Sequence, residues 1–356
     1  MPTLATRRLP RRDVTLTALG LGGAPLGGLY RAVGEAQARE TIVGAWQAGV
    51  RYFDTAPYYG YGASELRVGA ALRELEAGDA VISTKVGRLL RPRTTPQAAD
   101  DTWIRPLPFE PYYDYTGAGI LRSFEDSQQR LGIDRIDILL IHDIGRLTHG
   151  ADDARTFAQL VDRGGFAALD ELRRSGRVRA VGIGVNEVEA VERVMAAFDM
   201  DCVLLAGRYT LLEQGAAPLL ARCAERGIGV IVGGAFNSGI LADAPAAATG
   251  AARYNYLPAE PAIVKRVARL ARACEQYDVP LPAAALQFVL AHEAVVSCVT
   301  GARNARELRQ NVAWATQPLP TAFWDALRRD GLVDPACPVP GSAPSTDPAS
   351  RRGARG

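Results

Sequence analysis

Cysteine is scarce in this sequence and follows no pattern typical of metal binding. The five cysteines lie far apart, and no Cys-x-x-Cys pair occurs among them: Cys202, Cys223, Cys274, Cys298 and Cys337. Structural zinc sites and disulfide frameworks both need cysteines at characteristic spacings. We therefore expect neither a metal site nor a disulfide network, and a few unpaired thiols fit a cytoplasmic protein.

An excess of one charge and a long apolar run are also missing. The sequence has 41 lysines and arginines against 39 aspartates and glutamates, and a net charge of +2 argues against a broad nucleic-acid-binding surface. No apolar run reaches the ~18 residues of a membrane-spanning helix. The basic start, MPTLATRRLPRR, is not followed by the apolar segment of a secretory signal. We expect a small-molecule partner and no nucleic acid or membrane partner. The sequence leaves open whether the protein is a monomer or a homo-oligomer.

What the sequence does contain is an eightfold alternation of strand-like and helix-like segments. The strands are predicted from apolar runs typical of strands covered on both faces, at residues 18–23, 50–53, 80–85, 136–141, 178–185, 202–206, 228–233 and 295–300. This pattern predicts an α/β protein with a single (β/α)8 TIM barrel. We expect the barrel to span residues 1–333, with an N-terminal hairpin plugging one end and long loops at the C-terminal face. Residues 334–356, rich in proline, serine, arginine and glycine, are predicted to form a flexible tail.

Three neighbouring strands of this barrel end in side chains that can transfer a proton. Asp54 ends the second strand with Tyr59 five residues later, Lys85 ends the third strand, and His142 follows the fourth. Chemistry in such barrels takes place at the C-terminal ends of the strands. A phenol has a pKa near ~10, and a buried ammonium beside it favours the phenolate. The four residues therefore suit proton transfer at a carbonyl or hydroxyl oxygen. Two alternatives stay open: Lys85 is only a structural ion-pair partner of Asp54, and His142 is only a core histidine.

The motifs around these residues resemble the aldo-keto reductase superfamily. FDTAPYYG, residues 53–60, is similar to the most specific motif of that superfamily, and ISTKVG, RLGIDRIDILLIH and VGIGVNE follow in the expected order. The resemblance covers residues 18–315. It implies an oxidoreductase that uses a nicotinamide dinucleotide. It also implies that Tyr59 is the proton donor or acceptor, that Lys85 and Asp54 tune it, and that His142 orients the substrate oxygen.

The same resemblance implies which residues hold the cofactor. Asn186 matches the residue that binds the carboxamide, and Tyr209 matches the aromatic residue that stacks on the nicotinamide ring. The other implied contacts lie after the seventh and eighth strands, so that the whole set is Asn186, Tyr209, Gly234, Phe236, Asn237, Gly239, Gly301, Arg303, Glu307 and Asn311. Glu307 stands where arginine or glutamine is frequent, and a carboxylate suits a ribose hydroxyl but repels a 2′-phosphate. We therefore expect NAD, with NADP as the alternative.

The segment from Gly87 to Gly119 shows no periodicity and contains five prolines and several aromatic residues. A loop of this length in a compact domain is typically a lid or a binding loop. Aromatic faces pack well on sugar rings, so the candidate substrate contacts are Tyr30, Trp103, Tyr112 and Tyr113.

The expected substrate comes from the branch of the superfamily that the sequence resembles most. SFEDSQQRLGIDRIDILLIHD, VGIGVNE and RYTLLEQ resemble bacterial D-threo-aldose 1-dehydrogenases, including L-fucose and galactose dehydrogenases, with pyridoxal 4-dehydrogenase as a close relative. This resemblance implies an NAD(P)-dependent aldose 1-dehydrogenase that oxidises L-fucose, D-arabinose or a galactose-like sugar at the anomeric carbon to a lactone. The alternatives are a pyridoxal 4-dehydrogenase, an NADPH-dependent aldehyde or ketone reductase, and a non-catalytic cofactor-binding subunit.

Overall fold

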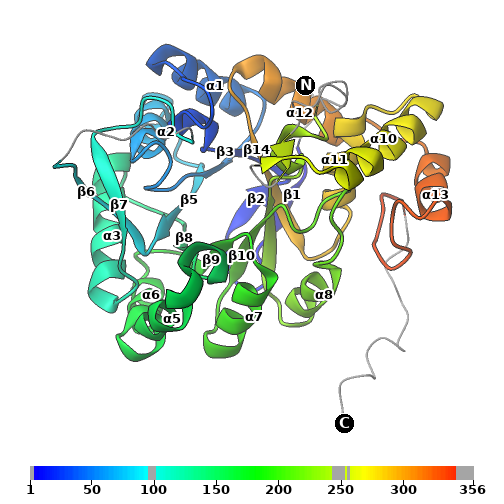
Figure 1. Cartoon of the computed structure of the whole chain (residues 1–356). Coiled ribbons are helices and arrows are strands. Elements are labelled where there is room, and N and C mark those ends of the chain that lie inside the picture. Colours follow the sequence, from blue (N-terminus) through cyan, green and yellow to red (C-terminus); the bar gives the residue numbers. More distant parts are fainter. Residues whose placement is uncertain (1–3, 95–101, 243–252, 255–256, 342–356) are drawn as a thin grey trace, which may run out of the picture.

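Eight parallel strands close into a barrel in a computed structural model that describes residues 4–94, 102–242, 253–254 and 257–341 (Figure 1). Around the barrel the order is β10, β11, β14, β3, β4, β5, β8 and β9. The strand bounds are β3 (Leu19–Gly22), β4 (Tyr52–Asp54), β5 (Val81–Val86), β8 (Ile138–His142), β9 (Ala180–Val185), β10 (Cys202–Ala206), β11 (Gly229–Gly233) and β14 (Val295–Gly301). The predicted (β/α)8 barrel is confirmed, and each strand overlaps the apolar run that predicted it.

Helices surround this barrel (Figure 1) and cover the outward faces of its strands. The α-helices are α1 (Glu35–Gln47), α2 (Ala63–Glu74), α3 (Gly117–Leu131), α4 (Arg146–His149), α5 (Asp153–Asp162), α6 (Gly165–Arg174), α7 (Val188–Ala197), α8 (Ala217–Glu225), α10 (Pro261–Gln276), α11 (Leu281–Leu290), α12 (Ala305–Thr316) and α13 (Thr321–Arg329). The described residues also form short 3-10 turns at η1 (Pro25–Gly27), η2 (Gly150–Asp152) and η3 (Asn237–Gly239). Residues 153–174 form two helices, α5 and α6, because Gly164 between them has a φ of 79°, through which no α-helix continues.

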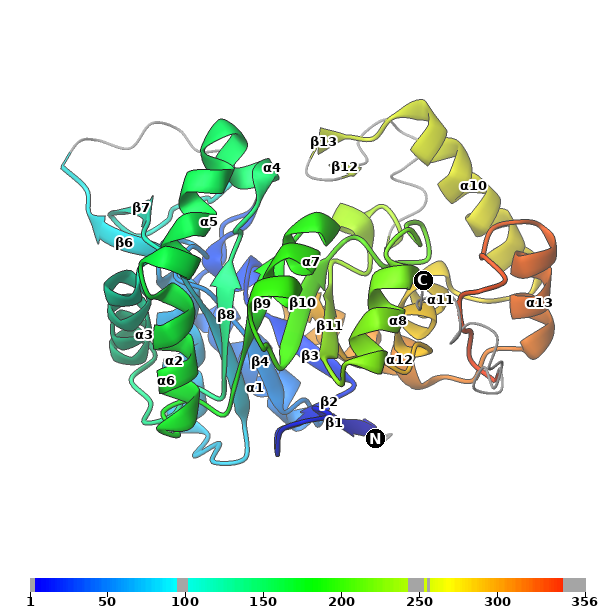
Figure 2. The same cartoon turned by 90° about the horizontal axis from the view of Figure 1, so that it is seen from below.

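The N-terminal hairpin plugs one end of the barrel, as predicted. Its strands β1 (Thr6–Arg8) and β2 (Thr15–Thr17) pair antiparallel. Leu9, Val14 and Leu16 are fully buried in one cluster with inward-facing barrel residues such as Leu140 and Ile231. In Figure 2 the hairpin lies at the lower end, opposite α4 and the strands β6 (Arg88–Pro92) and β7 (Phe109–Tyr113). The upper end, where the strands finish, is therefore left for the chemistry.

The aromatic segment after β5 contains a β-hairpin where no regular structure was expected. Strands β6 (Arg88–Pro92) and β7 (Phe109–Tyr113) pair antiparallel, with Arg88 opposite Tyr113. The sequence pattern did not indicate the hairpin, because its strands pair residues that are far apart in the sequence. The short pair β12 (Arg253–Tyr254) and β13 (Leu257–Pro258) lies at the same end of the molecule (Figure 2).

The predicted boundary at residue 333 is too early. Cys337 is 1% exposed and Val339 is 5% exposed, and both pack in the main core cluster. The Asp334 N–H donates to the Gln214 side-chain oxygen at 2.8 Å, and Arg328 donates to the Cys337 carbonyl at 2.8 Å. Two apolar side chains thus anchor a stretch whose overall composition indicated a loose tail. Residues 342–356 lie outside the described part of the chain.

Candidate active site

A buried ion pair joins the ends of β4 and β5. The Lys85 Nζ donates to both carboxylate oxygens of Asp54, at 3.0 and 2.8 Å, and to the Thr55 carbonyl at 2.9 Å. The two side chains are 2% and 3% exposed. Ser83 also donates to Asp54 at 2.7 Å, so the carboxylate is fully engaged. Burial lowers the pKa of Lys85, but Asp54 and Tyr59 raise it more, and the lysine stays protonated.

Tyr59 lies directly against this ion pair. The Lys85 Nζ is 4.6 Å from the centroid of the Tyr59 ring. Burial raises the pKa of Tyr59 to about 12, although the Lys85 charge lowers it. The predicted direction of the lysine effect is therefore present, but burial outweighs it. At neutral pH the phenol carries its proton, which it can donate, and it can accept a proton only as the pH rises.

His142 completes the predicted group at the end of β8. Its ring centroid is 6.0 Å from that of Tyr59, in an edge-to-face arrangement. Burial, Lys85 and Arg88 all lower the pKa of His142 well below its usual range, so the imidazole is neutral. Its Nδ1 is buried without a hydrogen-bond partner among the described residues. The structure thus brings together Asp54, Tyr59, Lys85 and His142, and a neutral imidazole can donate one hydrogen bond to a substrate oxygen.

A second ion pair lies beside His142 and was not predicted from the sequence. Arg88, the first residue of β6, donates through Nη1 to the Asp143 Oδ2 at 3.0 Å. The same carboxylate oxygen is 3.5 Å from the His142 Nε2. The signal was present: Arg88 lies three residues after Lys85, and Asp143 directly follows His142.

Of the four aromatic candidates, one packs directly on the proton-transfer residues. The Trp103 ring centroid is 5.7 Å from that of Tyr59. Its indole Nε1 is buried without a hydrogen-bond partner among the described residues. Tyr113 lies one step away, with its ring 5.2 Å from the Arg88 guanidinium. Tyr112 instead lies near Arg91, at 5.7 Å, on the other face of the hairpin. The Tyr30 N–H donates to the Thr102 carbonyl, next to Trp103.

Several implied cofactor residues line the rim formed by β9, β10, β11 and β14. Asn186 follows β9, half-buried, and its carbonyl accepts from Arg208 at 2.7 Å. The turn after β11 has left-handed backbone at Gly234 and Gly239. It is held by the Asn237 side chain, which accepts from Thr210 at 2.7 Å. Phe236 is half-buried in that turn and packs near Trp314, and exposed Gly301 ends β14.

Tyr209 does not fit its implied role. Its ring is fully buried, stacks on Phe288 at a centroid distance of 5.2 Å, and meets His292 edge to face. A ring that is covered in this way has no free face for a nicotinamide. The expectation for Tyr209 is therefore corrected, and the residue packs beneath α11.

The implied cofactor residues after β14 include a local ion pair at the start of α12. The Arg303 Nη2 and the Glu307 Oε1 are 2.7 Å apart, and Asn304 caps the helix by accepting from the Glu307 N–H. Burial alone raises the pKa of Glu307, but hydrogen bonds from Arg303 lower it below its usual range. Asn311, one turn further on, is buried. A helix N-terminus with an arginine suits a phosphate group, so these residues, together with Asn186 and the glycine turn, fit a nicotinamide dinucleotide.

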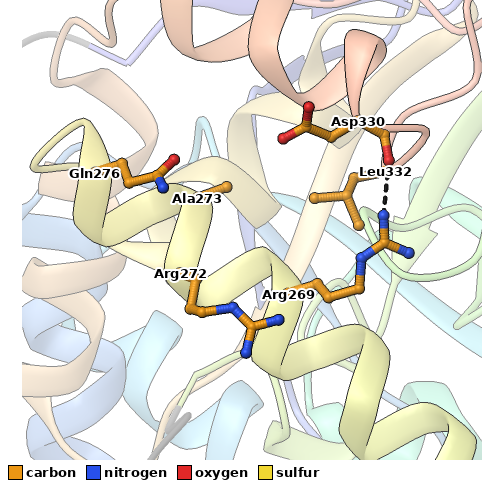
Figure 3. Close-up of a pocket in the computed structure, with 6 residues that line it drawn as sticks. All are labelled: Arg269, Arg272, Ala273, Gln276, Asp330 and Leu332. Atoms are coloured by element: carbon orange, nitrogen blue, oxygen red, sulfur yellow. Dashed lines mark hydrogen bonds between the residues drawn. The ribbon is translucent and has the colours of Figure 1, made fainter.

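Two cavities in the described part of the molecule lie away from these residues. The cavity in Figure 3, of about 320 Å³, lies between α10 and the turn after α13, where Arg269 donates to the Asp330 carbonyl at 2.7 Å. The other, of about 380 Å³, is bordered by Leu66, Leu90 and Phe109. Neither touches the proton-transfer group. Within the described residues no cluster of three metal-binding side chains occurs, and no helix has the length and apolarity to cross a membrane.

The sequence matches the model of the aldo/keto reductase family over residues 18–329. A pyridoxal 4-dehydrogenase of Microbacterium luteolum is 46% identical over 337 residues, which cover 92% of this chain and 97% of that protein. A D-threo-aldose 1-dehydrogenase of a Pseudomonas species is 41% identical over 325 residues, which cover 90% of this chain and 95% of that protein.

A solved structure has the same fold. The holo form of an aldo-keto reductase of Bacillus halodurans matches with a TM-score of 0.69 over 93% of this chain and 96% of that chain, at 23% identity.

Replacing Lys85 with methionine should raise the pKa of Tyr59 above its value of about 12. The change removes the positive charge of the lysine and leaves the negative charge of Asp54, which disfavours the phenolate. The tyrosine Cζ resonances report this by ¹³C NMR, with Tyr59→Phe assigning the signal. In the wild type the Tyr59 signal should begin to shift as the pH approaches about 12, and in the variant it should not. Lys265, the only other lysine and exposed, supplies the control Lys265→Met. Identical titrations of wild type and Lys85→Met would contradict this electrostatic role.

Proposed function

This chain belongs to the aldo/keto reductase family of oxidoreductases, and from that premise we propose that it oxidises an aldose at the anomeric carbon to a lactone. The observation that carries the proposal is the placement of Tyr59 against the buried Lys85–Asp54 pair, facing neutral His142. The 41% identity to a D-threo-aldose 1-dehydrogenase supports the substrate class. Trp103, packed on Tyr59, supplies an aromatic surface for a sugar ring.

Each residue of the group has one task in this reaction. The His142 imidazole donates a hydrogen bond to an oxygen of the substrate, which fixes the anomeric carbon near Tyr59. The Tyr59 phenolate takes the proton from the anomeric hydroxyl as the C–O bond becomes the lactone carbonyl. Lys85, held protonated by Asp54, stabilises the phenolate before the transfer. Since burial raises the pKa of Tyr59, oxidation is favoured at alkaline pH and the reverse reduction at lower pH.

The cofactor site that we propose runs from Asn186 through the turn at Gly234, Phe236, Asn237 and Gly239 to the start of α12 at Gly301, Arg303, Glu307 and Asn311. A bound nicotinamide dinucleotide supplies the acceptor for the hydride that leaves the anomeric C–H bond. Glu307 forms an ion pair with Arg303, and the guanidinium is therefore less free to bind a 2′-phosphate. We therefore favour NAD over NADP.

Pyridoxal is the second candidate substrate, and the 46% identity to a pyridoxal 4-dehydrogenase favours it. Pyridoxal closes into a cyclic hemiacetal through its neighbouring hydroxymethyl group, and an aldopyranose is also a cyclic hemiacetal. Oxidation of either compound breaks the same C–H and O–H bonds and gives a lactone. The same placement of Tyr59 and His142 therefore serves both substrates.

The proposal is tested by offering L-fucose, D-arabinose, D-galactose and pyridoxal with NAD and with NADP, at neutral and alkaline pH, while following the nicotinamide absorbance. We expect oxidation of at least one aldose, faster at the higher pH because the phenol must lose its proton. Oxidation of pyridoxal alone would replace the aldose proposal with the second candidate. If the protein oxidises none of these hemiacetals but reduces simple aldehydes, it is an aldehyde reductase. Cofactor binding without any turnover would indicate a non-catalytic subunit.

Replacing Glu307 with glutamine should shift the cofactor preference toward NADP. The change releases Arg303 for a 2′-phosphate and removes a repelling charge, so we expect the ratio of kcat/KM for NADP to that for NAD to rise about tenfold, or about 1.4 kcal/mol. The exposed Arg39–Glu74 pair between α1 and α2 offers a matched control, Glu74→Gln. An unchanged ratio in Glu307→Gln, or a wild type that already prefers NADP by more than tenfold, would overturn the assignment.

A further inference from the structure

The Arg88–Asp143 pair lies beside the proton-transfer group and has no part in the chemistry derived above. The guanidinium carbon of Arg88 is 3.1 Å from the ring centroid of Tyr58, the residue before Tyr59, and 5.2 Å from that of Tyr113. The guanidinium is thus held between two rings and tied at one end to Asp143. The Arg88 and Asp143 side chains are 12% and 23% exposed. Such a fixed, mostly covered donor group is pre-organised to bind a ligand.

The pair keeps unused hydrogen-bonding capacity. Among the described residues the Arg88 side chain makes one hydrogen bond, through Nη1, and its buried Nε has no partner. The Asp143 carboxylate receives that bond on Oδ2, while Oδ1 receives none from the described side chains. Burial raises the pKa of Asp143, opposed by Arg88 and Lys85, with Glu187 also raising it. A strong acceptor and a strong donor therefore stand side by side.

The backbone around the pair is arranged to place it there. Asp143 has a left-handed φ of 48°, which aspartate and asparagine tolerate better than most residues. Its N–H nevertheless continues the barrel ladder by donating to the Gly184 carbonyl at 3.0 Å. Gly87, with a φ of 89°, turns the chain out of β5 over the Tyr115 ring, so that Arg88 begins the hairpin next to β8. The end of the barrel thus fixes both members independently.

We propose that Arg88 and Asp143 form a subsite that binds the hydroxyl groups next to the reacting carbon of an uncharged substrate. This proposal rests on the proposed function, whose substrate class it narrows. The Asp143 Oδ2 is 3.5 Å from the His142 Nε2, and His142 holds the reacting oxygen, so the subsite faces the adjacent carbon atoms. A hydroxyl group can donate a hydrogen bond to the Asp143 carboxylate and accept one from the Arg88 guanidinium, so it can bind to both members of the pair. A substrate without these hydroxyls displaces water from the free hydrogen-bonding positions of the pair and leaves them unfilled, which is costly.

The test compares two aldehydes that differ only in these hydroxyls, each reduced by the holoenzyme with the nicotinamide it prefers. D-glyceraldehyde carries a hydroxyl on each of its two carbons beyond the aldehyde carbon, and propanal has the same carbon chain without hydroxyls. In the wild type we expect kcat/KM for glyceraldehyde to exceed that for propanal at least ~10-fold, the scale of a hydrogen bond to a charged group. In Asp143→Asn that ratio should fall at least ~10-fold, mainly through the KM for glyceraldehyde. Asparagine keeps the shape and tolerates the positive φ, so folding is preserved.

The same hairpin supplies the matched control. Arg91 and Glu110 pair across β6 and β7 at 2.6 Å on the exposed side, and Glu110→Gln makes the same change of carboxylate to carboxamide. In Glu110→Gln the ratio of kcat/KM for glyceraldehyde to that for propanal should stay within about twofold of the wild-type ratio. An unchanged ratio in Asp143→Asn, or an equal loss for both aldehydes, would overturn the subsite and leave the pair a structural support of His142. Neither result depends on aldose oxidation, so failure of the proposed function shows separately in the sugar panel.

Discussion

A lysine and an aspartate buried together at the ends of two adjacent strands are the interaction on which the site depends. Lys85 and Asp54 are almost inaccessible to water, and each is satisfied by the other and by neighbouring barrel atoms. Loss of one partner of a buried pair typically costs about 3–5 kcal/mol, because the other charge is left uncompensated. The barrel therefore holds the ammonium in one place. Gly184 on β9 leaves room for it, since a Cβ there would lie 3.3 Å from the lysine side chain.

This fixed charge determines the state of the residues around it. It lowers the pKa of Tyr59 against the larger effect of burial, and it helps to keep His142 neutral. The phenol and the imidazole can then share the two hydrogen-bonding positions of one substrate oxygen. The Arg88–Asp143 pair, on the next loops around the rim, adds a second charge pair that is partly open to solvent. We thus propose that one ion pair at the rim supports the proton transfer and that the other binds the substrate.

The barrel is predictable from the sequence because each strand of a parallel sheet is a continuous apolar run, and each run ends close to the polar residue that reaches the mouth. That rule alone groups Asp54, Tyr59, Lys85 and His142 at one end of the barrel. It fails where pairing or packing is non-local. The β6–β7 hairpin joins distant residues, and Cys337 and Val339 anchor a segment of loose composition. Tyr209 shows the limit of carrying a role over by motif, because its ring packs on Phe288 instead of facing the rim.

The proton transfer by Tyr59 is tested by the rate of hydride transfer in a single turnover of Tyr59→Phe. Tyr58→Phe is the matched control, since it alters a neighbouring ring of the same size and keeps the contact with Arg88. We expect a loss of at least ~10²-fold in Tyr59→Phe, the usual scale of general acid–base assistance. Cofactor affinity should be unchanged, and the control should lose little activity. Near-wild-type hydride transfer in Tyr59→Phe would show that another group transfers the proton.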